Sequence, residues 1–345
     1  MTPYRISRRA MLVAGATALA MPYIARAAAK SIVIATSGGA LEAAFDTAYY
    51  KPFTAKTGIA IIKAVNTYAK LKAMVDANAV EWDVMQVDST AAAGFARQGL
   101  FERLDYNGID KGDLIAGAAQ EYYVQCDVAA ACIAWNTKNV KPAQVPTTWE
   151  ELWDLKRFSG QRGLWKQPYQ TFELALMADG VAPDKLYPID VKRALKSLDR
   201  IKSDIFWWAN GAQSAQVLID GDIAAGMAWN GRLYDPKQHG APVDFSFNQA
   251  LFVSDSLVLP RGVKNKAEAM EFITFALQPQ QQANFAKALP YGPTNKKALA
   301  LLDPPRLAVL PSSEHNLALG VFQNFDWWAD NGPKAAETFD SWLLG

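Results

Sequence analysis

The chain has 345 residues, of which half are hydrophobic and a fifth are charged. This composition excludes an intrinsically disordered protein, and the length exceeds a single typical domain core, which indicates two domains. The formal net charge is +1, and it falls to −3 for residues 30–345 because all four charged residues before Lys30 are arginines, so a nucleic-acid partner is not expected.

The first 29 residues carry the parts of an export signal. Arginines precede an apolar, alanine-rich run over residues 11–21, and small residues follow up to position 29. Residues 7–12 (SRRAML) are more similar to a twin-arginine signal than to an ordinary secretion signal. The run is shorter than the roughly 20 residues that a membrane-spanning helix needs. We therefore expect a signal peptide over residues 1–29, cleavage near residues 28–30 and release into the periplasm.

Strands and helices alternate after residue 30, which is typical of an α/β domain. Strands are predicted at 31–36, 59–65 and 82–87, with helices at 41–53 and 70–75. In open α/β sheets ligands bind outside the carboxyl ends of the strands. The turns containing Ser37, Gly39 and Ser89 are therefore candidate cavity walls, unless these residues serve only as ordinary turn and helix-cap residues.

The second half of the chain predicts another domain. A strand at 128–135 is broken by residues 136–139, and a polar, proline-containing stretch follows, so we expect the chain to cross there. Further helices are predicted at 149–155, 189–201, 213–220 and 266–277, and further strands at 224–229 and 256–259.

The residue types of a catalytic or metal site do not come together in the sequence. His239 and His315 have no Cys or second His at metal-ligand spacing. A nucleophile elbow, a phosphate-binding loop and a dinucleotide fingerprint are all missing. We expect no enzyme activity, no catalytic residues, no cofactor and no metal. Cys126 and Cys132 form either a disulfide across a tight loop or two buried thiols.

Eleven tryptophans include the pairs Trp207-Trp208 and Trp327-Trp328. Most tryptophans belong to a core, but adjacent ones point in opposite directions and often leave one ring at a cleft.

Seven segments occur in an order that is typical of one family. They are 52–58 (PFTAKTG), 82–84 (WDV), 148–153 (TWEELW), 226–231 (GMAWNG), 254–260 (SDSLVLP), 264–266 (KNK) and 290–294 (PYGPT). This order resembles the spermidine/putrescine-type periplasmic binding proteins of ABC transporters over nearly the whole chain after residue 30.

The resemblance implies an α/β fold of the type II periplasmic binding proteins, with two lobes, each a mixed sheet flanked by helices, joined by hinge crossovers. We expect one lobe at 30–134 plus 254–300 and the other at 135–253 plus 301–345. It also implies hinge closure around the ligand, a monomer, and recognition of the closed form by the permease of an ABC importer or by a receptor.

The resemblance also places ligand-binding residues. Trp229 and Asp255 match the family's aromatic wall and its amine-binding carboxylate, and Ser89 falls at a polar cavity position. Where diamine binders have a second carboxylate, this chain has Gln170, which is neutral. After the Trp-Asn-Gly motif, where polyamine binders commonly have a small residue, it has Arg232. Tyr291, Trp207 and Trp328 are further candidates for the walls because they lie close to the motifs.

An arginine in the cavity would repel a polyamine but would bind a carboxylate with paired hydrogen bonds. Arg232 together with Asp255 therefore favours a zwitterion with separated charges, an ω-amino acid such as 4-aminobutyrate. If Arg232 instead pairs with Asp235, polyamine binding remains possible. Two less favoured functions are ferric ion capture through Tyr49-Tyr50 or Tyr122-Tyr123 and catalysis by a periplasmic enzyme.

Overall fold

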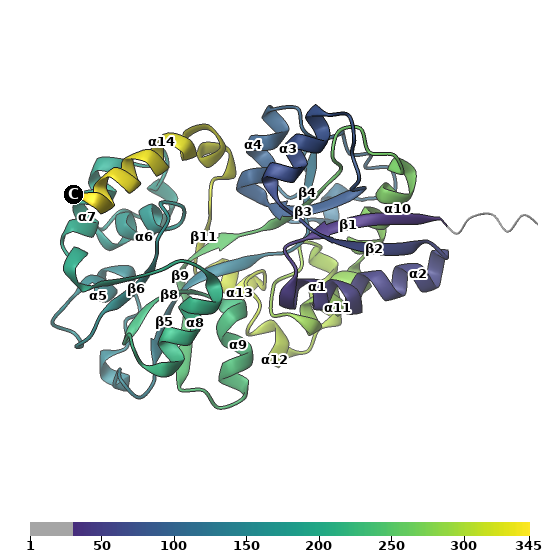
Figure 1. Ribbon diagram of the computed structural model, residues 1–345. Helices are drawn as coiled ribbons and strands as arrows, with labels where there is room; N and C mark the ends of the chain where they lie inside the picture. The colour runs from purple at the N-terminus through teal and green to yellow at the C-terminus, as the bar shows by residue number, and fades with distance from the viewer. Residues whose placement is uncertain (1–29) are drawn as a thin grey trace, which may run out of the picture. The chain divides into compact units, whose positions relative to one another are not determined.

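The computed structural model describes residues 30–345, so the export signal expected over residues 1–29 lies outside the described part of the chain. Residues 31–345 form one compact unit that contains two mixed sheets flanked by helices (Figure 1). The expected α/β fold is therefore confirmed.

The first sheet has the strand order β2-β1-β3-β10-β4. β1 is parallel to β2 and β3, whereas β10 runs antiparallel to β3 and β4. The bounds of its strands are β1 Ser31–Thr36, β2 Ala60–Val65, β3 Val84–Asp88, β4 Tyr123–Gln125 and β10 Asp255–Val258.

Helices cover both faces of this sheet because its strands are apolar on both sides. Ile32 and Ile34 of β1 pack with α1, α2, α10 and α11, while Ala35 points to the opposite face and packs with α3 and α4. In Figure 1, α3 and α4 lie on one side of this sheet and α1 and α11 on the other. The bounds are α1 Gly39–Phe45, α2 Lys51–Thr57, α3 Tyr68–Asp76, α4 Ser89–Arg97, α10 Lys266–Ala276 and α11 Pro279–Ala288. A π-helical turn at Asp46–Tyr50 joins α1 to α2. Gly58, at φ 75°, ends α2 as predicted, and its N–H donates to the carbonyl of Thr54.

The second sheet has the order β11-β9-β5-β8-β6-β7. Its strands are β5 Ala129–Asn136, β6 Arg162–Trp165, β7 Ile205–Trp208, β8 Ala225–Trp229, β9 Val243–Val253 and β11 Val321–Phe322. The remaining helices are α5 Trp149–Trp153, α6 Thr171–Ala178, α7 Val191–Asp199, α8 Gly211–Asp220, α9 Asn230–Gln238, α12 Pro304–Leu307, α13 Glu314–Leu317 and α14 Phe325–Leu344. Short 3-10 turns occur at Lys111–Asp113, Pro142–Gln144, Pro183–Lys185, Lys202–Asp204 and Lys296–Leu301.

We call the five-stranded sheet with the helices that pack on it the first lobe, and the six-stranded sheet with its helices the second lobe. The expected boundary after residue 134 lies inside β5, whose partners β8 and β9 are both in the second lobe. Leu302 and Leu310, expected in the second lobe, pack with Ala283 and Ala286 of α11 in the first. We therefore propose that the chain first crosses at 126–128 and that the first lobe extends to about residue 310.

Two crossing segments, 126–128 and 253–255, join the sheets and are bonded to each other. The N–H of Cys126 donates to the carbonyl of Asp255 at 2.8 Å, and the N–H of Asp255 donates to Oδ1 of Asp127 at 3.0 Å. Ser254 Oγ donates to the carbonyl of Asp127 at 2.5 Å. The side chains of these segments are consequently held at fixed positions beside both sheets.

None of the helices within residues 30–345 has the length and apolar character of a bilayer-spanning segment.

Candidate ligand-binding site

A cavity of about 580 Å³ lies beside the crossing segments. Its walls come from α4 and the turn before it, from the crossing segments, from residues 165–170, from the start of α9 and from α14. The volume is within the range of about 300–1,000 Å³ that is typical of small-molecule sites. Six of the ten residues predicted for the site line this cavity: Gln170, Trp229, Arg232, Asp255, Tyr291 and Trp328.

Three carboxyl groups line the cavity, those of Asp88, Asp127 and Asp255. Asp88 ends β3 and caps α4, where its Oδ1 accepts from the N–H groups of Thr90 at 2.8 Å and Ala91 at 3.2 Å. Asp255 begins the antiparallel neighbour β10 and is directly opposite Asp88 in the register. Asp127 comes from the other crossing segment, so the strand arrangement itself gathers the three acids.

Desolvation raises the pKa of each of these carboxyl groups. Burial, followed by the charge of Asp88, raises the pKa of Asp255 to about 7, although a hydrogen bond from Gln86 acts in the opposite direction. Burial and then the charge of Asp255 raise the pKa of Asp127 well above its usual value. Burial also raises the pKa of Asp88, opposed by the N–H groups that it caps. A bound cation would stabilise the ionised forms of all three.

Trp229 forms an aromatic wall that its neighbours hold in place. Its ring meets Trp165 edge to face at 5.1 Å and Trp208 at 5.3 Å between centroids. The indole N–H donates to Oε1 of Gln170 at 2.9 Å. Gln170 is buried, with a φ of 65°. Its neutral carbonyl thus orients the aromatic wall in addition to lining the cavity.

The start of α9 is fixed by contacts of the Trp-Asn-Gly motif. The buried amide of Asn230 accepts from the N–H of Ala130 at 3.0 Å and donates to the carbonyl of Pro290 at 2.6 Å. Gly231 lies so close to Tyr291 that a Cβ there would be 2.2 Å from Cε1 of the ring. Only glycine therefore fits between α9 and Tyr291 without displacing one of them.

Arg232 follows directly and lines the cavity with an exposed side chain. It makes no ion pair with any acid of residues 30–345, and this includes Asp235. Burial and the charges of Asp255 and Asp127 raise the pKa of Tyr291, while the charge of Arg232 lowers it. The arginine and two of the carboxyl groups thus act on the same tyrosine.

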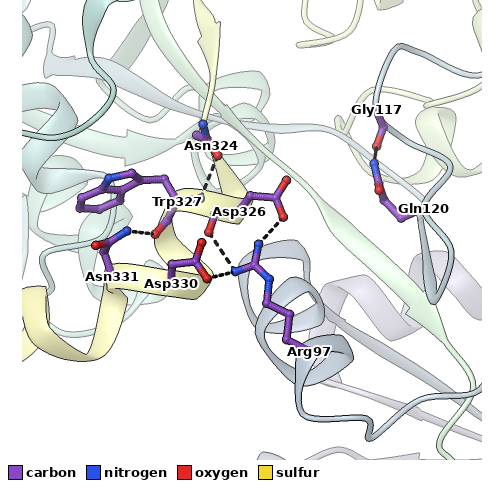
Figure 2. A network of polar contacts seen from close by, with 8 residues as sticks. All are labelled: Arg97, Gly117, Gln120, Asn324, Asp326, Trp327, Asp330 and Asn331. Carbon is purple, nitrogen blue, oxygen red and sulfur yellow. Dashed lines mark hydrogen bonds and ion pairs between the residues drawn. The ribbon is translucent and has the colours of Figure 1, made fainter.

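Helices α4 and α14 both line the cavity and are joined by an ion-pair cluster (Figure 2). Arg97, at the end of α4, donates to Oδ1 of Asp326 at 2.7 Å and to Oδ1 of Asp330 at 2.5 Å. The backbone carbonyl of Asp326 accepts a third bond at 3.2 Å. Gly94 of α4 and Ala329 of α14 line the cavity beside this cluster. Since α4 belongs to the first lobe and α14 packs on the core of the second, Arg97 links the lobes.

Trp328 lines the cavity from α14, and its indole N–H donates to Oε1 of the buried Glu173 at 2.6 Å. Tyr187 and Gln323 donate to the same oxygen. Burial raises the pKa of Glu173.

Four residues predicted for the site do not line the cavity. Ser37 and Gly39 open α1 at the end of β1, and the N–H of Ser37 donates to Gln86 at 3.1 Å. Ser89 Oγ is fully buried, 2.7 Å from Ser256 Oγ. Trp207 packs edge to face on Phe339 and Trp342. These residues belong instead to the turn after β1, the first sheet and the packing of α14.

Sequence reasoning missed several lining residues. Asp88 stood in a turn that was identified as a candidate wall, so a signal for it existed. Asp127 directly precedes a strand, and the sequence gave no signal for it, because its place in the cavity depends on two crossing segments that are 128 residues apart in sequence. Tyr68, Trp165 and Tyr169 also line the cavity and belong to no recognised motif.

Most residues that suggested ferric capture or a disulfide are in the core, and Tyr122 is partly buried. Tyr49 and Tyr50 are buried, with Tyr49 stacked on Phe285 at 5.4 Å. Cys126 and Cys132 are both buried free thiols. Within residues 30–345, the His, Cys, Asp and Glu side chains form no group that could hold a metal ion.

Comparisons with known proteins agree with this architecture. Residues 48–308 match the family model described as bacterial extracellular solute-binding protein. The chain is 36% identical to the gamma-aminobutyric acid-binding protein of Pseudomonas aeruginosa over 94% of both chains. It is 26% identical to the spermidine/putrescine-binding periplasmic protein of Escherichia coli over 73% of this chain and 75% of that protein. A solved GABA-receptor structure superposes with a TM-score of 0.85 at 38% identity, covering 91% of this chain and 98% of the other. The chain therefore belongs to the bacterial extracellular solute-binding proteins.

Proposed function

We propose that the protein captures an ω-amino acid of the 4-aminobutyrate type in the periplasm and presents it to the permease of an ABC importer. The observation that carries this proposal is that Arg232, which has no ion-pair partner within residues 30–345, lines the same cavity as Asp255. Two similar proteins are named for gamma-aminobutyric acid, which supports the ligand class.

The chemistry of the cavity suits a zwitterion. A guanidinium binds a carboxylate through two parallel hydrogen bonds, and a carboxylate accepts bonds from an ammonium. Tyr291 lines the same cavity and interacts with both kinds of charge, and the ring of Trp229 can cover the methylene groups and attract an ammonium through its face.

The cavity is larger than a four-carbon amino acid would fill. Closure of the two lobes around the ligand would reduce the volume and exclude water from the charged ends. The crossing segments are the expected pivot because they are the short connections between the sheets.

Polyamine capture is the second candidate, and one observation favours it. Asp88 and Asp127 add two acids to the cavity beyond Asp255, so the cavity is more acidic than the neutral Gln170 had suggested. Arg232 separates the two candidates, because it would repel a second ammonium group and bind a carboxylate.

Calorimetric titration of the ligand-stripped protein tests the proposal. The ligands are 4-aminobutyrate, putrescine, spermidine, a simple monoamine and a simple monocarboxylate. Arg232→Ser should weaken 4-aminobutyrate binding about 10- to 100-fold, because a hydrogen bond to a charged group contributes about 1.5–3 kcal/mol. Arg261→Ser removes an exposed arginine outside the cavity and is the control.

Unchanged affinity of the Arg232→Ser variant for 4-aminobutyrate would contradict the proposed role. Tight binding of putrescine by the wild-type protein, without binding of 4-aminobutyrate, would establish polyamine capture instead.

A further inference from the structure

Asp127 has a carboxyl oxygen that no group in the described structure satisfies. The residue is 1% exposed. Its Oδ1 accepts from the N–H of Asp255 at 3.0 Å, whereas Oδ2 is buried and has no hydrogen-bond partner within residues 30–345. Leaving a buried carboxylate oxygen unpaired is costly, so the ionised form of Asp127 requires a compensating group.

A structural role accounts for only half of this side chain. The bond from Oδ1 to Asp255 ties the two crossing segments together, but the neutral amide oxygen of an asparagine would accept it equally well. The second oxygen and the negative charge contribute nothing to that contact.

The surroundings of Asp127 show what is missing. It lines the cavity, and the titratable groups whose charges interact with it are Asp88, Asp255, Tyr49, Tyr291 and Cys126. None of these groups is basic, and the acids within residues 30–345 form no group that could hold a metal ion. A positively charged ligand group in the cavity is what would compensate this charge.

We propose that Asp127 is a specificity-determining residue that acts beside Asp255 and makes the site select a charged amine end over a neutral end of the same shape. This inference rests on capture of an amino compound at this cavity, but it holds for either an ω-amino acid or a diamine.

The inference includes a proton balance. Burial and the charge of Asp255 raise the pKa of Asp127, and burial and the charge of Asp88 raise that of Asp255 to about 7, so these acids in the empty cavity take up protons at a higher pH than ordinary carboxyl groups do. An ammonium in the cavity lowers both pKa values, and the carboxyl protons pass to the buffer as the ligand binds. A neutral ligand end releases no proton.

The test compares Asp127→Asn with the wild-type protein on two matched pairs of ligands: 4-aminobutyrate with 4-hydroxybutyrate, and putrescine with 4-aminobutan-1-ol. Asn keeps the acceptor for the N–H of Asp255. Asp83→Asn is the control, since Asp83 is a buried acid of the same lobe outside the cavity. Titrations in buffers of different ionisation enthalpy count the protons released.

We expect the variant to bind the preferred amine about 10- to 100-fold more weakly while binding the matching hydroxyl compound equally well or better. Proton release should fall relative to the wild-type protein. In Asp83→Asn the ratio of the two affinities should stay as in the wild type, even if the fold is less stable. A purely structural role would weaken both members of a pair alike, and this result would overturn the inference.

The outcomes separate this inference from the proposed function. If the wild-type protein binds 4-aminobutyrate and Asp127→Asn keeps the affinity ratio, the function stands and the inference fails. If only putrescine binds and the ratio collapses in the variant, the inference stands and the ω-amino acid proposal fails. Binding of neither amine would overturn both.

Discussion

Replacing Asp255 by Asn should stabilise the empty protein at neutral pH while removing amine binding. Burial and the charge of Asp88 raise the pKa of Asp255 to about 7, from 3.8 for an ordinary aspartate. Between those two values the folded protein holds a proton that the unfolded chain has lost, so the free energy of unfolding falls as the pH rises from about 4 to about 7. An asparagine cannot ionise and avoids this loss.

The size of the effect follows from the pKa difference. Each pKa unit corresponds to about 1.4 kcal/mol, so full ionisation of Asp255 costs on the order of 4 kcal/mol. Asp255 is only partly buried because it faces the cavity, and the variant weakens the bond from Gln86, which is worth about 1 kcal/mol. We therefore expect a net stabilisation of about 1–3 kcal/mol at pH 8 and little or none at pH 5.

Urea unfolding of the ligand-stripped proteins between pH 5 and pH 8 measures this difference. Asp330→Asn, at an exposed acid, is the control and should show no comparable pH dependence. If the difference in the free energy of unfolding between Asp255→Asn and the wild type is the same at pH 8 as at pH 5, the electrostatic reasoning is refuted. Titration of the wild-type protein should also show weaker amine binding below about pH 7, because Asp255 must then lose a proton before the ammonium binds.

Two further substitutions test the walls. Arg97→Ala should speed ligand release by a few-fold, and high salt should abolish the difference from the wild type, because the ion pairs of Arg97 to α14 are largely exposed and contribute at most about 1 kcal/mol each. Stopped-flow release kinetics measure this effect, with Arg103→Ala, whose ion pair lies within the first lobe, as the control. Equal release rates for both variants would exclude a link between the lobes. Gly231→Ala should displace Tyr291 or α9, lower the free energy of unfolding by about 1–3 kcal/mol and weaken ligand binding. Thermal unfolding and titration measure these two effects, and wild-type affinity in the variant would mean that α9 adjusts freely.

The sequence predicted the sheets better than the connections between them. Apolar, β-branched runs such as 31–36 and 82–87 identified strands of the first sheet, because a strand that is buried on both faces is apolar along its whole length. The strand beginning near residue 128 was also found, but its sheet was not, because pairing of β5 with β8 and β9 is a long-range contact that local periodicity does not encode.

The sequence motifs identified several of the residues that line the cavity. Trp229, Arg232 and Asp255 stood in or beside recognised segments, and they line one cavity. Trp207 and Ser89 do not line the cavity, because the Trp207 ring packs on aromatic rings of α14 and the Ser89 hydroxyl lies 2.7 Å from that of Ser256. Residue type and position in a motif do not specify which way a side chain points, and packing decides it.

The buried amide of Asn230 anchors the start of α9 both to β5 and to the segment before Tyr291. The residues proposed to bind the charged groups of the ligand are therefore anchored close to the crossing segments, whereas α4 and α14 line another part of the cavity, where Arg97 joins one helix to the other. The two parts of the cavity can therefore be changed separately. We expect substitutions at Gly94 and Ala329, which line the cavity from α4 and α14, to change the length or bulk of the ligand that fits, while the binding of its charged ends stays as in the wild type.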